Sequence, residues 1–151
     1  MIDSRAKGAR IELQARDKLR ELTGLSWERV PASGALNEKH GLKGDLYVPN
    51  TNNIYCVEVK GRKDPILNHK ILNSAKSDLE KFWDQAQSQA LKVNKFPILI
   101  FKWDRSKFYV AYAKKPDYVF YPWVHINAID NDFFVSYLED FIKYEKIEWI
   151  T

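Results

Sequence analysis

Residues 44–63 read GDLYVPNTNNIYCVEVKGRK, and this stretch has the pattern of a β-hairpin. Two apolar runs, 45–48 and 54–60, flank a turn rich in proline and asparagine. Because side chains alternate between the two faces of a strand, Glu58 and Lys60 point to the same face of the second run. A carboxylate and an ammonium group therefore project together from one surface, with Asp45 on the neighbouring strand.

Asp45, Glu58 and Lys60 are the residue types that build a metal-dependent site for phosphodiester cleavage. Mg²⁺ takes oxygen ligands and keeps several waters, so a phosphodiester can complete its coordination shell. The ion lowers the pKa of a bound water, and a lysine can position that water or offset the developing charge. Surface strands also carry Glu and Lys for solubility alone, and these three residues by themselves leave that alternative open.

The size and composition indicate a folded single domain over residues 1–151. A hydrophobic content of 45% and an aromatic content of 14% argue against disorder. No apolar run approaches the ~20 residues of a membrane span. The first residues lack the hydrophobic stretch of a signal peptide, so we expect a soluble cytoplasmic protein without membrane partners.

The cysteine and histidine content argues against a zinc site. Cys56 is the single cysteine and lies in the apolar run 54–59, which predicts a buried thiol and excludes an internal disulfide. His40, His69 and His125 are scattered without the spacing of metal ligands. No motif for an organic cofactor is present, and none is expected.

The net charge of +4 is distributed unevenly along the chain. Residues 117–151 contain seven acidic and two basic residues, whereas residues 1–116 contain 22 basic and 13 acidic residues. The basic residues gather at the start of the chain, before Asp45 and directly after Lys60. Such clusters are typical of a protein that binds a polyanion, although an ordinary solvated surface is the alternative.

Hydrophobic periodicity predicts an α/β fold with a central mixed sheet flanked by helices. A first helix over 4–22 is followed by a short strand at 26–31 and a polar loop at 32–44. The remaining predicted elements, in chain order, are the hairpin, a helix at 74–93, strands at 97–103 and 107–113, and a last helix at 132–144.

Four short motifs in this order resemble the archaeal-type Holliday junction resolvases, which belong to the PD-(D/E)XK nuclease superfamily. They are Lys7-Gly8 with Glu12, the run 31–34 (PASG), Gly44-Asp45, and Glu58-Val59-Lys60 with Arg62-Lys63 behind it. A fifth, weaker match is Gln85-Ala86. The resemblance covers roughly residues 5–90 and implies a restriction-endonuclease-like core of the order αβββαβ.

The resemblance also implies roles for individual residues. It makes Glu12, Asp45 and Glu58 ligands of Mg²⁺ or Mn²⁺, with the Val59 carbonyl as a further ligand and Lys60 as the catalytic lysine. It implies a functional role for Ser33, which alternatively is a turn residue that bonds its own backbone. The residues implied to contact DNA are Arg5, Lys7, Arg10, Lys43, Arg62, Lys63 and Gln85.

Several alternatives remain at this point. Glu12 alternatively pairs with Arg16 on the helix surface, and Gln85 alternatively is an ordinary surface residue. The late aromatic residues, Tyr121 and Trp123 among them, could cover either the core or a dimer face. Gly44 stands where the family usually has proline, and the chain beyond residue 95 shows no family motif.

The function implied is that of a homodimeric, metal-dependent endonuclease that resolves four-way DNA junctions. A symmetric dimer suits a substrate of near two-fold symmetry. One rival is an enzyme of the same superfamily that cuts flaps, replication forks or plain duplex. Another is a DNA-binding module that does not cleave, and a structural scaffold would leave the basic excess of residues 1–116 unexplained.

Overall fold

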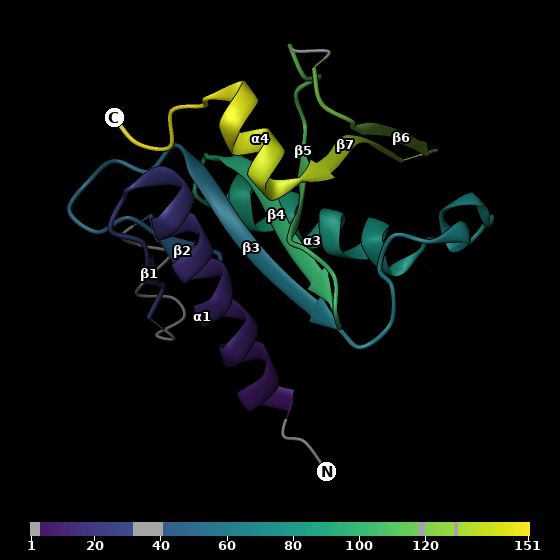
Figure 1. Ribbon diagram of the computed structural model, residues 1–151, viewed down its shortest axis with the longest axis horizontal. Helices are drawn as coiled ribbons and strands as arrows, with labels where there is room; N and C mark the ends of the chain where they lie inside the picture. Colours follow the sequence, from purple (N-terminus) through teal and green to yellow (C-terminus); the bar gives the residue numbers. More distant parts are fainter. Residues whose placement is uncertain (1–3, 32–40, 118–119, 129) are drawn as a thin grey trace.

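The computed structural model describes residues 4–31, 41–117, 120–128 and 130–151 (Figure 1). A seven-stranded sheet in the order β1-β2-β3-β4-β5-β7-β6 forms its centre. β3 and β4 pair in parallel and every other neighbouring pair is antiparallel. The α/β class with a central mixed sheet flanked by helices is therefore confirmed. The strands are β1 (Glu28–Arg29), β2 (Leu46–Tyr47), β3 (Tyr55–Arg62), β4 (Phe96–Trp103), β5 (Tyr109–Tyr112), β6 (Val124–Ala128) and β7 (Asn131–Tyr137).

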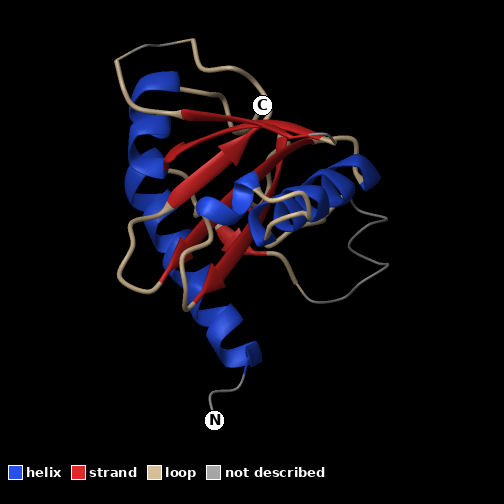
Figure 2. Cartoon of the chain, turned by 90° about the vertical axis from the view of Figure 1, so that its right-hand side faces the viewer, coloured by secondary structure: helices blue, strands red, loops and turns tan. Residues whose placement is uncertain are grey.

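Helices cover both faces of this sheet (Figures 1 and 2). On one face, α1 (Ser4–Thr23) and α4 (Leu138–Glu145) pack on a core that includes Val57 and Val59. On the other face, α3 (Asp78–Lys92) packs on a second core that includes Leu99 and Phe101. These last two residues are the register partners of Glu58 and Lys60 in the parallel pair, so Glu58 and Lys60 share the α3 face. The alternation predicted for the run 54–60 is confirmed.

The helices predicted at 4–22 and 74–93 are present as α1 and α3, with small shifts at their ends. α1 ends one residue beyond the prediction, where Gly24 adopts a φ of 73° and its N–H donates to the Arg20 carbonyl at 2.9 Å. α3 begins later than the predicted residue 74, because Ser77 and Glu80 form a reciprocal capping box. Phe82 and Trp83 are buried in the core beneath α3, as expected from their spacing.

Between α1 and α3, the described chain also contains a short 3-10 helix, η1 (His69–Leu72), in the connection from β3. The predicted hairpin is present but short. β2 has two residues, and its register pairing with β3 is that of Leu46 with Val57. β1 adds to the outer side of β2 and forms one edge of the sheet.

The predicted helix at 132–144 is wrong in its first half. Residues 131–137 form β7, and only from Leu138 does the chain continue as α4. Phe133, Phe134 and Val135 are all buried, because β7 has helices over both faces of the sheet and its neighbour β6 at the edge. A strand buried on both faces loses the period of two, so its apolar run resembles a helix. β6 itself was not predicted.

Of the late aromatic residues, Tyr121 belongs to the interior, and Trp123 is partly buried against the core. Tyr121 is buried and its ring stacks on Tyr144 with centroids 5.3 Å apart. Trp123 packs edge-on against Phe134. In the described part of the chain, no helix has both the length and the apolar character that a membrane span needs.

Candidate active site

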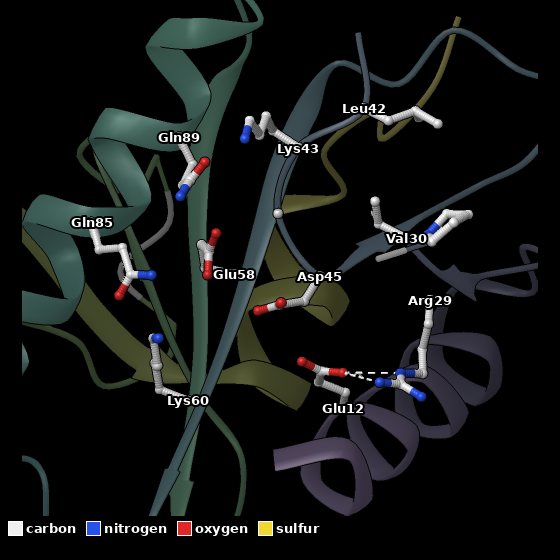
Figure 3. A pocket seen from close by; sticks show the side chains of 12 residues that line it. Glu12, Arg29, Val30, Leu42, Lys43, Asp45, Glu58, Lys60, Gln85 and Gln89 are labelled. Carbon is white, nitrogen blue, oxygen red and sulfur yellow. Dashed lines mark hydrogen bonds and ion pairs between the residues drawn. The ribbon is translucent and has the colours of Figure 1, made fainter. Parts of the chain in front are cut away.

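A cavity of about 320 Å³ opens between the first helix, the hairpin and α3 (Figure 3). It brings together four of the five side chains predicted to be catalytic: Glu12, Asp45, Glu58 and Lys60. The fifth, Ser33, lies outside the described residues. In Figure 3 the carboxylates of Glu58, Asp45 and Glu12 follow one another across the cavity, with Asp45 between the other two.

β3 supplies Glu58 and Lys60 to the cavity. Glu58 is only 4% exposed. Burial raises the pKa of Glu58 above its ordinary value, whereas the charges of Lys60 and Lys43 act in the opposite direction. An acidic group is thus held in the wall of the cavity, with two cations beside it that favour its ionised form.

Asp45 is fixed by hydrogen bonds on both sides. Its backbone N–H donates to the Val57 carbonyl at 2.7 Å, and its carbonyl accepts from the Val30 N–H at 2.9 Å. Its carboxylate accepts from the Val59 N–H at 2.7 Å. Burial, and then the charge of Glu58, raise the pKa of Asp45 to about 7. Asp45 is therefore a rigidly placed carboxyl group whose ionised form the free protein stabilises poorly.

The same hydrogen bond places the Val59 backbone at the cavity. The N–H and C=O of one strand residue lie on the same edge of the strand. Because the Val59 N–H points at Asp45, its carbonyl also faces the Asp45 side of β3 and not β4. This orientation agrees with the predicted role of the Val59 carbonyl as a ligand.

Gly44 is required for the approach of Asp45 to β3. Its φ is +82°, and a Cβ at this position would lie 2.7 Å from the Val57 carbonyl oxygen and 3.0 Å from the Cys56 sulfur. Neither an L side chain nor the proline usual in the resembled family would suit this backbone. Cys56 is buried and free, as predicted.

Glu12 reaches the cavity from α1. Its carboxylate accepts hydrogen bonds from Arg29, at 2.9 Å from Nε and 2.8 Å from Nη2. Burial and the charge of Asp45 raise the pKa of Glu12, whereas Arg29 opposes the rise. The alternative pairing of Glu12 with Arg16 is wrong, because Arg16 bonds to Asp17 at 3.0 Å.

Close packing brings this turn of α1 to the sheet. A Cβ at Gly61 would lie 2.8 Å from Cγ1 of Ile11, the residue before Glu12. The absence of a side chain at Gly61 lets α1 cross β3 closely, and this contact sets the position from which Glu12 reaches the cavity.

The cavity offers oxygen donors for a divalent cation. Among the described residues, no three His, Cys, Asp or Glu side chains are placed to hold a metal ion, since Glu12 is turned to Arg29. Asp45 and Glu58 nevertheless form a desolvated pair of carboxylates whose charges repel. Carboxylate and carbonyl oxygens are the ligands that Mg²⁺ and Mn²⁺ prefer, so the residues present fit such an ion. Both contacts with Arg29 use the same oxygen of Glu12, Oε2, and Figure 3 shows the other oxygen directed toward Asp45.

The residues predicted to contact DNA fall into three groups. Lys43 and Gln85 line the cavity itself. Arg62 and Lys63 line a neighbouring cavity at the end of β3. Lys7 and Arg10 lie on the first turns of α1, together with Arg5, whose side chain is outside the described part.

Sequence reasoning missed two polar residues of the cavity, Arg29 and Gln89. Arg29 reaches Glu12 because β1 pairs with β2, and no local sequence pattern predicts that pairing. Gln89 follows Gln85 by four residues and therefore lies on the same face of the helix. This spacing could have predicted that Gln89 lines the same cavity. Its Oε1 is buried and has no hydrogen-bond partner in the described structure.

Comparison with known proteins places these features in a family. Residues 3–149 match a family described as "Phage putative PDDEXK endonuclease". Protein D14 of Escherichia phage T5 is 49% identical over 113 residues, which cover 73% of this chain and 71% of that protein. No solved structure matches significantly. Because the family match spans nearly the whole sequence, this chain belongs to the phage PDDEXK endonuclease family, within the PD-(D/E)XK nuclease superfamily and its restriction-endonuclease-like fold.

Proposed function

We propose that the protein is a Mg²⁺-dependent endodeoxyribonuclease that resolves four-way DNA junctions by paired phosphodiester hydrolysis, with Mn²⁺ as an alternative ion. One observation carries this proposal above the others. A buried carboxyl pair, Asp45 and Glu58, shares one cavity with Glu12 and the ammonium group of Lys60. Family membership supports a nuclease and goes no further.

In this proposal Asp45, Glu58, the Val59 carbonyl and Glu12 would hold the metal ion. The bound ion supplies Lewis acidity and a water of lowered pKa. Lys60 projects from the same face as Glu58 and provides a positive charge beside the reacting phosphate. Arg29, which pairs with Oε2 of Glu12, adds a second positive charge to the lining of the cavity.

The choice of a branched substrate rests on charge and on the lack of a base-reading motif. Basic residues flank the cavity on α1 and after β3, and phosphate contacts of this kind bind DNA without reading its sequence. Selectivity would then come from the shape of the DNA. A homodimer presents two such cavities to two strands of a near-symmetric junction.

The test is to incubate the purified protein with Mg²⁺ and labelled four-way junction, flap, fork, nicked and linear duplexes. We expect paired cuts in the junction and weaker cleavage of linear duplex. Asp45→Asn should abolish cleavage, because it removes a charged ligand, while leaving junction binding nearly intact.

Other outcomes separate the rivals. Preferred cleavage of flaps, forks or plain duplex would assign the protein to another substrate within the superfamily. Tight DNA binding with no cleavage of any substrate, in Mg²⁺ or Mn²⁺, would indicate a binding module. Cleavage by Asp45→Asn at the wild-type rate would remove the proposed metal site.

A further inference from the structure

A second cavity, of about 370 Å³, lies beside the candidate active site at the end of β3. The connection from β3 to α3, residues 63–77, forms most of its wall. Four basic residues and two acidic residues line it: Arg62, Lys63, Lys70, Lys76, Asp64 and Asp78.

The basic side chains of this cavity differ in whether their charge is neutralised. Lys76 is paired with Asp84 at 2.7 Å. Lys63 and Lys70 are exposed, and neither forms an ion pair within the described part of the chain. Arg62 lies with its guanidinium carbon 4.5 Å from the centre of the Phe82 ring and likewise has no carboxylate partner among the described residues. Three cations therefore line the cavity without forming an ion pair in the described structure, against two carboxylates, those of Asp64 and Asp78.

One residue of each cavity lies on the same face of β3. Lys60 and Arg62 are two residues apart on β3, so their side chains project to the same side about 6.6 Å from each other. Both contact the ring of Phe82, with Lys60 Nζ at 5.7 Å from its centre and Arg62 at 4.5 Å. The Phe82 ring thus lies against both cations, at the boundary between the two cavities.

We propose that this basic cavity binds the backbone phosphates next to the scissile one, on the strand that continues past the cut. The inference rests on the proposed function, because it takes the scissile phosphate to lie at Lys60. A polyanion that places one phosphate at Lys60 brings its next phosphates within reach of Arg62, Lys63 and Lys70. Neutral or cationic ligands would leave these three cations uncompensated.

Such a subsite has a consequence for the substrate class. The basic cavity binds the DNA strand on one side of the cut. The protein therefore favours DNA that extends beyond the scissile phosphate over DNA that ends there. This is the behaviour of an endonuclease, and it requires no contact with bases.

Binding is tested first, in an Asp45→Asn background in which DNA is not cut. Lys63→Ala/Lys70→Ala should raise the Kd for four-way junction DNA by roughly tenfold and lower the salt slope by about 1.8, which is about 0.9 for each phosphate contact. The charge-matched control is Lys114→Ala/Lys115→Ala. This pair is exposed and lines a different cavity, which includes Tyr55 at the opposite end of β3.

The control should change the Kd and salt slope little. An unchanged Kd and slope in Lys63→Ala/Lys70→Ala would overturn the proposal. So would an equal loss in the control, since it would reduce the effect to net charge. This arm reports on the subsite even if the protein proves not to cleave junctions.

Cleavage supplies the second arm. After the cut is mapped, the substrate is shortened from each end in turn. Removing the phosphates on one side should lower kcat/KM for the wild type, and Lys63→Ala/Lys70→Ala should then add no further loss on the shortened substrate. A variant whose loss is the same on full-length and shortened DNA contradicts contact with those phosphates.

Discussion

At the scale of single residues, Asp45 makes the free protein sensitive to pH. Its pKa is about 7 in the folded chain, against an ordinary value of 3.8. The fold therefore favours the protonated carboxyl. As pH rises from about 4 to about 7, the unfolded chain gives up this proton more readily than the folded chain, and stability falls. Above pH 7 the penalty is constant.

Asp45→Asn should accordingly stabilise the metal-free protein at pH 8, by an amount on the order of 2 kcal/mol, and have little effect at pH 4. Asparagine keeps an oxygen that can accept from the Val59 N–H but carries no charge to repel Glu58. Urea unfolding in EDTA at both pH values measures the difference. An identical change in unfolding free energy at both would show that the Asp45 charge is not the cause.

The residues of the cavity show which parts of the site the sequence could predict. Alternation along one strand was enough to place Glu58 and Lys60 on a common face, because that rule is local. Asp45 was named from the hairpin pattern and Glu12 through the resemblance, and the structure brings both to the cavity. Arg29 could not be found, since its contact with Glu12 depends on the pairing of β1 with β2.

At the scale of elements, the crossing of α1 over β3 positions the Glu12 carboxylate. Gly61→Ala would place a Cβ 2.8 Å from Cγ1 of Ile11, which is too close for two carbon atoms. The substitution should therefore move this turn of α1 outward. We expect a loss of stability of about 1–3 kcal/mol from overpacking, and a loss of cleavage in the molecules that remain folded. Chemical denaturation and single-turnover cleavage at a temperature well below unfolding measure the two effects.

Gly8→Ala is the matched control on the same helix. Nothing lies within 4 Å of a Cβ at Gly8, so alanine should be neutral or stabilise α1 by about 0.5–1 kcal/mol. Cleavage should be unchanged by this substitution. If Gly61→Ala cleaves as well as Gly8→Ala does, the close crossing is a packing feature without influence on the site.

Elements were predicted well where their signals are local. The glycine stop at Gly24 is a short motif that marks the end of α1. The capping box at Ser77 and Glu80 is equally local but was not used, so the start of α3 was predicted too early. β7 was taken for helix because Phe133, Phe134 and Val135 are buried together, and a two-sided environment erases the strand period. That environment exists only after the sheet and its helices assemble.

At the scale of the whole molecule, charge is divided between two parts of the chain. The basic excess lies in residues 1–116, which contain the cavity and both flanking groups of basic residues. The acidic excess lies in residues 117–151, which form β6, β7 and α4. In the proposed function, a DNA backbone would be attracted to the first part and repelled by the second.

The proposed paired cleavage makes a demand on the number of active sites. The cavity holds one set of catalytic side chains, so in the proposed mechanism two cuts made together in opposed strands use two subunits, each addressing one strand. Mixing wild-type subunits with Asp45→Asn subunits, and allowing exchange, should give heterodimers that nick a four-way junction once. A junction in a small circular DNA distinguishes the cases, since paired cuts linearise the circle and a single cut only nicks it. We expect nicked circles to increase as the Asp45→Asn fraction rises, because a heterodimer retains one working cavity.

If sedimentation equilibrium at micromolar concentration finds only monomers, and junctions are still resolved in pairs of cuts, the two-subunit mechanism is wrong and each chain must cut twice in succession.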